Sequence, residues 1–536
     1  MLRPLTPAAL AAVLIAALPL AGCGSGARFD EDRLLAHIST LSSDEFGGRA
    51  PASPGEEKTV AYLTAGFEEL GLEPGNPDGT WVQAVPLVGS TAITMQGSSE
   101  PGGDWEPGVD FVAWTKRVVP EVSASGQLLF VGYGVQAPEY RWDDFGDTDV
   151  AGKILVVLVN DPPGERHFGG DAMTYYGRWT YKFDKAAAMG ALGALIVHET
   201  GPAGYPWEVV RGSWTGEQLD LRTPGGNLDR LEVEGWISRQ QAVSLFSAAG
   251  LDFEVARRAA TYPDFTPIPL GITASFALET SHREIDSNNV VARIPGSEAP
   301  GETVVYTAHW DHLGTVLGME GDNIYNGAFD NATGTTGLLA LARAFVAGGA
   351  PRRSILFLAV TAEETGLLGS RHYAQNPLYP SAETVAAINL DGMNVWGRTN
   401  DITVVGLGQS ELDDIAATVA AESGRVLTPD PEPEKGFYYR SDHFEFAKVG
   451  IPAFYPDGGV DFIGKPPGFG MEVRATYVAE AYHKPGDEVQ DWYDLSGMVD
   501  DLEFLYQMGR RLADSDSWPE WSETSEFRAA READRP

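Results

Sequence analysis

Apolar residues at spacings of three and four predict two helices between residues 28 and 75. Such spacing gathers apolar side chains on one face of an α-helix, and that face can then pack against a core. The positions are Leu34, Leu35, Ile38 and Leu41 in the first segment and Tyr62, Leu63, Phe67, Leu70 and Leu72 in the second.

The pattern changes in the next two segments. Residues 75–107 are rich in Gly, Pro and Ser, which predicts mainly loop with a strand or two. Residues 126–266 begin with the short apolar runs 128–131 and 154–159, and a helical stretch near residues 182–189 leads into a further run at 194–197. Apolar runs of this length indicate buried β-strands.

From residue 289 onward, strand and helix patterns alternate. The strand candidates are residues 290–294, 304–307, 355–360 and 385–389, and the clearest helices are 335–346 and 412–422. This order predicts an α/β fold whose mostly parallel central sheet is flanked by helices. The tail after residue 514 is charged and Ser-rich without periodicity, so we expect it to be disordered.

The N-terminus has the pattern of an export signal. Arg3 precedes an apolar run, residues 8–20, that is too short to span a bilayer comfortably. The run ends in Leu-Ala-Gly-Cys at residues 20–23, which resembles a bacterial lipobox, and Cys23 is the only cysteine of the chain. The resemblance implies acylation of Cys23 and a place in the bacterial cell envelope, facing the periplasm or the exterior. We expect membrane contact only through that anchor.

Length and charge narrow the remaining possibilities. A chain of 536 residues exceeds the size of a single core, so two domains are expected. The hydrophobic fraction of 43% argues against wholesale disorder. A net charge of -38 makes nucleic acid an unfavourable partner, because its phosphates would be repelled.

Acidic and imidazole side chains follow three successive strand candidates. Open α/β sheets place their sites at the carboxyl ends of the strands, so these side chains are expected to meet there. Another acidic residue, Asp330, lies in a turn-rich segment that ends where a helix begins. The residues at the strand ends are His309 and Asp311, then Glu363 and Glu364, then Asp391.

These residue types suit a pair of zinc ions. Zinc accepts imidazole and carboxylate ligands, and a catalytic zinc needs about three protein ligands plus an open position for water. Two neighbouring metals need one shared carboxylate. We expect one metal on His309, Asp330 and Asp391, and the other on Asp330, Glu364 and a later histidine, for which His483 is the natural candidate. Glu363 and Asp311 then remain free of metal.

Two family resemblances follow from these motifs. The sequence Asp-Val-Ala-Gly-Lys-Ile at 149–154, with Lys185-Ala186 and Gly-Ala-Leu-Gly-Ala at 190–194, resembles a protease-associated (PA) domain. The order His-x-Asp, Asp-Asn, Glu-Glu, Leu-Asp-Gly and late His resembles the di-zinc aminopeptidases related to bacterial leucyl aminopeptidase. The first resemblance covers about a quarter of the chain and the second nearly half.

The aminopeptidase resemblance implies a role for each site residue. Five residues would be zinc ligands, Glu363 the general base, and Asp311 the group that orients the imidazole of His309. The Asp330-Asn331 peptide bond is often cis in this family. The implied ligands of the two zinc ions are His309, Asp330, Glu364, Asp391 and His483.

Some assignments stay open at this point. His312 is interpreted as a surface residue or a second-shell group, because it breaks the His-x-Asp spacing. The family often carries Ser-Asp-His where this chain has residues 441–443, with a nearby tyrosine that polarises the scissile carbonyl. Either Tyr438 or Tyr439 could fill that role, and packing around the site is an equal alternative.

The predicted layout places every proposed ligand outside the insert. Residues 1–22 are the signal peptide, 23–121 and 266–514 the peptidase domain, 122–265 the inserted PA domain, and 515–536 the tail. The predicted function is hydrolysis of N-terminal residues from peptide substrates. The alternatives are a carboxypeptidase or glutaminyl cyclase of the same fold, and a non-catalytic peptide-binding lipoprotein.

Overall fold

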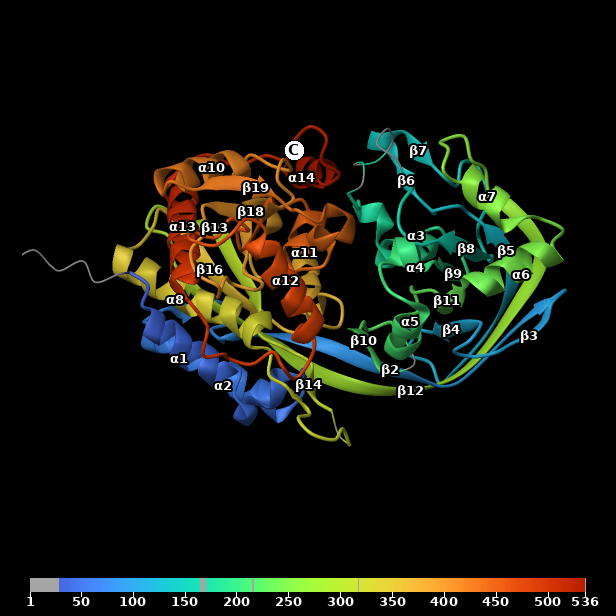
Figure 1. Cartoon of the computed structure of the whole chain (residues 1–536), viewed down its shortest axis with the longest axis horizontal. Coiled ribbons are helices and arrows are strands. Elements are labelled where there is room, and N and C mark those ends of the chain that lie inside the picture. The colour runs from blue at the N-terminus through green and yellow to red at the C-terminus, as the bar shows by residue number, and fades with distance from the viewer. Residues whose placement is uncertain are drawn as a thin grey trace, which may run out of the picture.

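One continuous β-sheet runs through both parts of the chain in the computed structural model of the protein, and each part has its own hydrophobic clusters (Figure 1). The structure describes residues 28–163, 168, 170, 172–214, 216–316 and 318–535. In spatial order the main strands are β19 (Val426–Pro429), β18 (Asp401–Val405), β20 (Ala453–Asp457), β17 (Thr384–Asn389), β13 (Ala299–His309), β16 (Arg353–Val360), β12 (Ile268–Ile294), β5 (Glu121–Phe130), β8 (Ile154–Leu158), β9 (Gly193–His198), β11 (Val233–Ser238) and β4 (Phe111–Trp114).

The α/β domain is built around three parallel strands, with β13 between β16 and β17. Side chains alternate across the sheet, as the period of two requires. Val304 and Tyr306 of β13 contribute to the core on one face, whereas Val305 contributes to the core on the other. Both faces are therefore covered, which explains the uninterrupted apolar runs. All four strands predicted from residue 289 onward are confirmed.

Helices cover the two faces of this part of the sheet. One core holds side chains from five helices and the opposite core holds side chains from two shorter ones. Helix α1 begins after Asp30, whose carboxylate accepts a hydrogen bond from the backbone N–H of Arg33 at 2.9 Å, a standard N-terminal cap. The helices are α1 (Glu31–Leu41), α2 (Pro54–Glu69), α8 (Gly334–Gly348), α10 (Leu412–Glu422) and α13 (Ser496–Asp514) on one face, and α9 (Leu368–Gln375) and α11 (His443–Lys448) on the other.

The expectation of mainly loop over residues 75–107 is wrong for most of that segment. Residues Val82–Glu100 form one long strand, β2, which pairs antiparallel with β12 along most of its length. Its proline, glycines and serines weaken the intrinsic preference for a strand, so the strand depends on the ladder of backbone hydrogen bonds to a distant partner. The pattern of apolar and polar residues within one segment cannot reveal a partner strand that lies far away in the sequence.

The insert has its own core on the right of Figure 1, and β12 runs along the bottom of both parts. This core extends from Trp105 to Leu278, beyond the expected limits 122–265 at both ends. The identity of the insert as a PA domain and the predicted domain limits stay predictions. Its helices are α3 (Trp179–Ala188), α4 (Thr200–Ala203), α5 (Trp207–Trp214), α6 (Arg239–Ala248) and α7 (Phe253–Ala259).

The expectation of a disordered tail is also wrong for residues 515–535. Trp521 is 1% exposed, and its indole N–H donates to the carbonyl of Gly450 at 2.9 Å. Phe527 is buried beside it, ahead of the short helix α14 (Arg528–Asp534). These two aromatic residues belong to the same hydrophobic cluster as Phe444 and Ile451 of the α/β domain. They carry no helical or strand periodicity, so the sequence pattern gave no sign of them.

None of the helices in the described part of the chain combines the length and the apolar character needed to cross a bilayer. The predicted signal peptide and the lipobox cysteine, Cys23, lie outside the described residues.

Candidate active site

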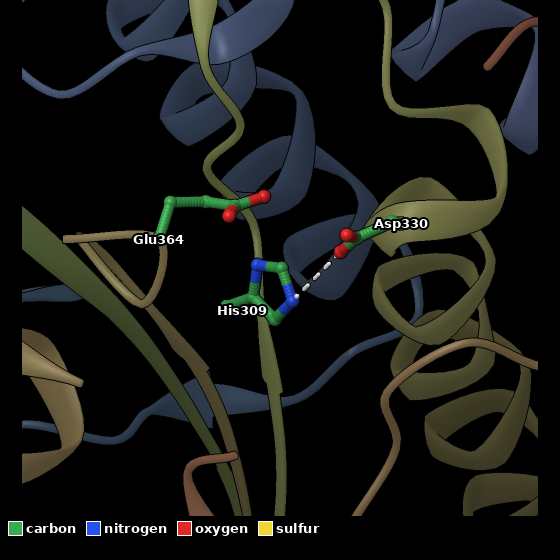
Figure 2. A group of neighbouring side chains, drawn as sticks. All are labelled: His309, Asp330 and Glu364. Carbon is green, nitrogen blue, oxygen red and sulfur yellow. Dashed lines mark ion pairs between the residues drawn. The ribbon is translucent and has the colours of Figure 1, made fainter. Parts of the chain in front are cut away.

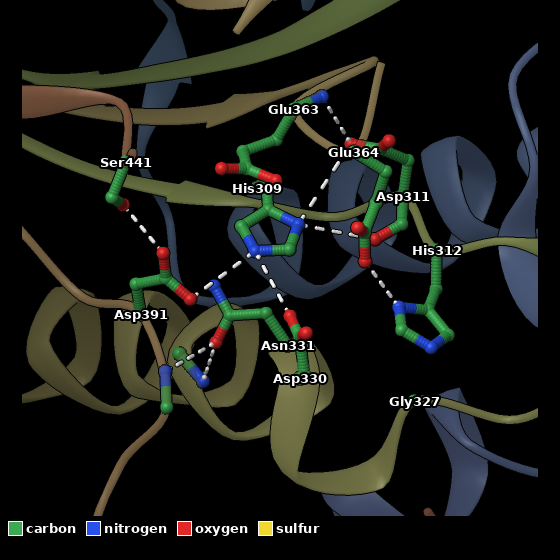
Figure 3. A network of polar contacts seen from close by, with 12 residues as sticks. His309, Asp311, His312, Gly327, Asp330, Asn331, Glu363, Glu364, Asp391 and Ser441 are labelled. Atoms are coloured by element: carbon green, nitrogen blue, oxygen red, sulfur yellow. Dashed lines mark hydrogen bonds and ion pairs between the residues drawn. The ribbon is translucent and has the colours of Figure 1, made fainter. Parts of the chain in front are cut away.

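Polar residues gather where the parallel strands end. The strands β13, β16 and β17 are neighbours in the sheet and run in the same direction, so their carboxyl ends share one edge. Figure 3 shows the side chains from these ends pointing toward one another. The residues are His309 at the end of β13, Glu363 and Glu364 just after β16, and Asp391 just after β17.

Two further residues reach this edge from helix-associated segments. Asp330 lies in the irregular turn Ala328–Thr333 before α8, and its peptide bond to Asn331 is cis. His483 follows α12 (Phe469–Glu480). The structure thus brings together every residue predicted for the site.

The carboxylate of Asp330 lies between the two histidines. Its Oδ1 is 3.3 Å from Nε2 of His309, and its Oδ2 is 3.4 Å from Nε2 of His483. Each histidine faces a second carboxylate as well, with Asp391 Oδ1 at 3.3 Å from His309 and Glu364 Oε2 at 3.0 Å from His483. The arrangement is two three-residue groups that share Asp330.

These separations suit metal ligands. Ligand atoms bound at about 2.1 Å in a tetrahedral zinc site lie roughly 3.4 Å from one another. The observed separations of 3.0 to 3.4 Å match that spacing. Glu363 is also near, because its carboxylate, an imidazole nitrogen of His309 and a carboxylate oxygen of Asp391 lie within 4.8 Å of one another. Residues His309, Asp330 and Asp391 could hold one ion, and Asp330, Glu364 and His483 a second.

The two nitrogens of His309 have different partners. Its Nδ1 lies 3.1 Å from the backbone carbonyl of Asp311, which fixes the proton on that nitrogen and leaves the Nε2 lone pair toward Asp330 and Asp391. Figure 2 shows Glu364 near the ring of His309 while Asp330 lies at Nε2, although the three residues lie within 4.8 Å of one another. Because one imidazole offers one lone pair, these three residues do not form a single site.

Asp311 was expected to orient the imidazole of His309, but its closer contact is with the backbone of Glu363. Its carboxylate lies 3.9 Å from Nδ1 of His309, whereas Oδ1 accepts a hydrogen bond from the backbone N–H of Glu363 at 3.1 Å. Burial raises the pKa of Asp311 to about 7, and the charge of His309 opposes the rise. Asp311 therefore ties the end of β13 to the segment that carries Glu363.

Neighbouring side chains also hold two carboxylates of the site in place. His312 is buried, and its Nδ1 lies 2.5 Å from Oε1 of Glu364, which leaves Oε2 toward His483. Ser441 donates its hydroxyl hydrogen to Oδ2 of Asp391 at 2.5 Å, which leaves Oδ1 toward His309. His312 is therefore not a surface residue but supports the site by its contact with Glu364.

The charges in the site favour a cation. Burial and the charge of Asp330 oppose ionisation of Glu364, but His312 and His483 lower its pKa to about 2. Burial would lower the pKa of His483, yet Asp330 and Glu364 raise it to about 10. The carboxylates therefore create a strongly negative potential at the imidazole nitrogens, where a divalent cation would be stabilised.

Glu363 differs from the other carboxylates. Among the described residues its carboxylate has no hydrogen bond or ion pair, and it lines a cavity of about 380 Å³ together with His309, Asp330 and Asp391. Burial raises its pKa well above the usual range, helped by the charges of Asp391 and Glu364 and opposed by that of His309. A partly buried carboxylate without a partner, beside residues that could hold a metal, suits a general base.

The cavity is walled by aromatic rings, some of which the sequence did not single out. Tyr455 lies beside Asp391, with its hydroxyl 3.4 Å from the backbone carbonyl of that residue. Neither Tyr438 nor Tyr439 lines the cavity, and the hydroxyl of Tyr439 donates to Glu526 at 3.1 Å. The aromatic side chains that line the cavity are Phe329, Trp396, Phe437, Tyr455, Phe462, Tyr477 and Tyr482.

Two further buried residues, missed at the sequence level, support the loops of the site. The guanidinium of Arg49 donates to four backbone carbonyls at 2.6 to 2.9 Å, those of Leu41, Trp310, Asn326 and Gly327. The carboxylate of Asp487 accepts hydrogen bonds from the backbone N–H groups of Phe329 and Asp330 at 2.9 and 3.1 Å. Both contacts join segments that are distant in the sequence, so no local motif marks them.

Comparisons with known proteins agree with this geometry. Residues 289–500 match the model of Peptidase family M28. The chain is 28% identical over 366 residues to a probable glutamate carboxypeptidase of Arabidopsis thaliana, which covers 62% of this chain and 47% of the relative. It is 34% identical over 152 residues to a probable zinc metalloprotease of Leptosphaeria maculans, covering 28% of this chain and 35% of the relative. The chain thus spans less than half the length of these curated relatives.

A solved structure shares the fold over most of the chain. The aminopeptidase from Aneurinibacillus sp. strain AM-1 superimposes with a TM-score of 0.51 at 19% sequence identity, covering 92% of this chain and 96% of that one.

Proposed function

We propose, since residues 289–500 belong to peptidase family M28, that this protein is a two-zinc exopeptidase that removes residues from the N-termini of peptides. The observation that carries the proposal is the position of Asp330, whose two carboxylate oxygens face two different histidines at 3.3 and 3.4 Å. A carboxylate shared in this way is what a pair of neighbouring metals requires.

Each residue of the site then has a defined task. One zinc would bind to His309, Asp330 and Asp391, and the other to Asp330, Glu364 and His483. Bound zinc supplies a water of lowered pKa and polarises the scissile carbonyl. Glu363 takes a proton from the attacking water and passes it to the amine of the departing peptide.

The shape of the cavity supports cleavage close to a chain end. Its volume of about 380 Å³ has room for a few side chains, and aromatic rings are among the residues that line it. Phe329 and Tyr477 pack at 4.6 Å between ring centroids, directly beside Asp330. The first side chain of the substrate would lie against these rings, with its free amino group near the metals.

Purified protein tests this proposal by metal analysis and a peptide panel. We expect about two zinc ions per chain, loss of hydrolysis on chelation, and recovery when zinc is restored. Peptides with free N-termini should be hydrolysed and N-acetylated ones should not. Faster cleavage of N-blocked peptides with free C-termini would instead support a carboxypeptidase. A content of one zinc, with cyclisation of N-terminal glutamine, would support a cyclase.

We also propose that Cys23 carries a lipid anchor that holds the protein in a bacterial cell envelope. The supporting observations are the Leu-Ala-Gly-Cys motif at residues 20–23 and the absence of any other cysteine in the sequence. Replacement Cys23→Ala is expected to move the protein from the detergent phase to the aqueous phase in a partition assay, because a stable anchor depends on the acyl chains. Detergent partitioning that survives the replacement would contradict the anchor.

A further inference from the structure

The loop that carries Glu363 and Glu364 has an unfavourable backbone conformation. It connects β16 to α9, and two of its non-glycine residues, Ala362 and Leu367, have φ angles of 54° and 61°. Residues with a Cβ rarely adopt this left-handed region, because the side chain crowds the backbone there. Such a conformation persists only where surrounding contacts fix it. The position of the proposed general base therefore depends on the contacts that this loop makes.

Arg371 makes one of these contacts from the first turn of α9. Its Nη2 donates to the backbone carbonyl of Gly366 in the loop at 3.1 Å. The side chain is buried, and its other nitrogens face two carboxylates, with Asp220 Oδ1 at 3.7 Å from Nη1 and Glu445 Oε1 at 3.6 Å from Nε. Burial would lower the pKa of Arg371, but Glu445 and Asp220 raise it above its usual range. Arg371 thus stays charged between the loop and two acidic residues.

One of these acidic residues belongs to the insert. Asp220 lies in β10 (Gln218–Leu221), which pairs antiparallel with β2 where the two parts of the chain meet (Figure 1). Its side chain is buried, and burial opposes its ionisation, but Lys116, Arg230 and Arg371 lower its pKa. The carboxylate is therefore charged, and Arg371 is its partner across the junction.

An apolar cluster joins the same segments. Leu221 of the insert directly follows Asp220, whereas Ala362 and Leu368 lie at the two ends of the loop that carries Glu363. The buried members of the cluster are Val85, Leu87, Leu221, Ile285, Ala362 and Leu368. The insert is thus tied to the loop twice, through apolar packing and through the ion pair with Arg371.

We propose that the insert positions the general base through Arg371, with Asp220 as the counter-ion across the junction. Arg371 is not among the residues that line the cavity, so it is a positioning residue that acts on the loop through the carbonyl of Gly366. Without the charge of Asp220, the guanidinium is drawn toward Glu445 and loses the position that suits this hydrogen bond. The inference rests on the proposed exopeptidase function and makes turnover depend on docking of the insert.

The replacement Asp220→Asn tests this coupling, because asparagine keeps the shape of the side chain and removes its charge. We expect kcat on a peptide with a free N-terminus to fall roughly 3-fold to 30-fold at unchanged KM and zinc content, the range of coupling between contacting side chains. Arg371→Gln should lower kcat at least as far. The double variant should match the slower single variant, since both changes remove one connection. A loss equal to the product of the two single losses would overturn the coupling.

Hydrogen exchange of the purified protein tests the position of the loop without relying on activity. Amides of residues 361–368 should exchange roughly 3-fold faster or more in Asp220→Asn, because the loop opens more often. Glu232→Gln is the matched control, since Glu232 pairs with Arg117 at 3.0 Å within the part of the chain that carries the insert core, and it should behave as the wild type. Arg371→Lys keeps the charge that faces Asp220 and should recover part of kcat.

Thermal unfolding verifies that each variant folds. Exchange of residues 361–368 at the wild-type rate in Asp220→Asn would overturn the proposal, whether or not the protein hydrolyses peptides. If the wild type hydrolyses no peptide, the exopeptidase function fails, and the exchange rates alone decide whether the insert positions the loop.

Discussion

Replacement Glu363→Gln is expected to lower kcat by roughly 100-fold to 10,000-fold while the protein keeps its two zinc ions, because a general base contributes about that factor. The carboxylate of Glu363 lines the cavity and has no hydrogen bond or ion pair among the described residues. Glutamine has the same shape but cannot take a proton from water. The measurements are kcat on a peptide with a free N-terminus and zinc per chain.

The neighbouring residue provides the control for this experiment. Glu364 faces His483 at 3.0 Å and His312 at 2.5 Å, so Glu364→Gln should weaken one metal and lower the zinc content. If Glu363→Gln loses a zinc and Glu364→Gln keeps both, the two roles are exchanged. Full activity in both variants would place the chemistry elsewhere in the protein.

Much of the candidate site could be predicted from the sequence, because several of its residues directly follow parallel strands. His309, Glu364 and Asp391 each follow an apolar run long enough to identify as a strand. Parallel strands bring such positions together whatever the rest of the chain does. Asp330 and His483 do not follow a strand, and they were assigned from the number and type of ligands that two zinc ions need, in agreement with the family resemblance.

The contacts that hold the site residues in place could not be predicted from the sequence, because each of them joins segments that are far apart in the chain. Arg49 holds the backbone of Trp310 and Gly327, and Asp487 holds that of Asp330. The spacing of His312 left open whether it lies at the surface or supports the site, and the bend of the chain after β13 turns it toward Glu364. These positions depend on tertiary packing, which periodicity does not report.

The position of the insert relative to the cavity also could not be predicted from the sequence. A PA-like segment is expected to be a separate module, and its strands were recognisable from their apolar runs. Gly204 nevertheless lines the cavity. It lies in a segment between strands, and its position depends on docking of the insert on the α/β domain, where Met173 and Tyr175 contact Pro433 and Phe444.

Replacement Asp330→Asn should have the largest effect on metal binding, because both proposed zinc ions share this carboxylate. Burial opposes ionisation of Asp330, but hydrogen bonds with His309 and His483 hold its pKa well below the usual range, so the side chain is charged. An asparagine offers one oxygen and turns an NH2 group toward the other histidine. Asp391→Asn is the matched control, because Asp391 faces only His309 of the two histidines.

We expect zinc in Asp330→Asn to fall from about two ions to less than one per chain, and in Asp391→Asn to fall by about one. Activity of Asp330→Asn should fall by roughly 1,000-fold or more, since bound metal supplies several kcal/mol of transition-state stabilisation. Zinc titration and peptide hydrolysis measure both effects, and circular dichroism verifies the fold. Retention of two tightly bound zinc ions by Asp330→Asn would show that another group bridges them. Loss of a single zinc would confine Asp330 to one of the two histidine groups.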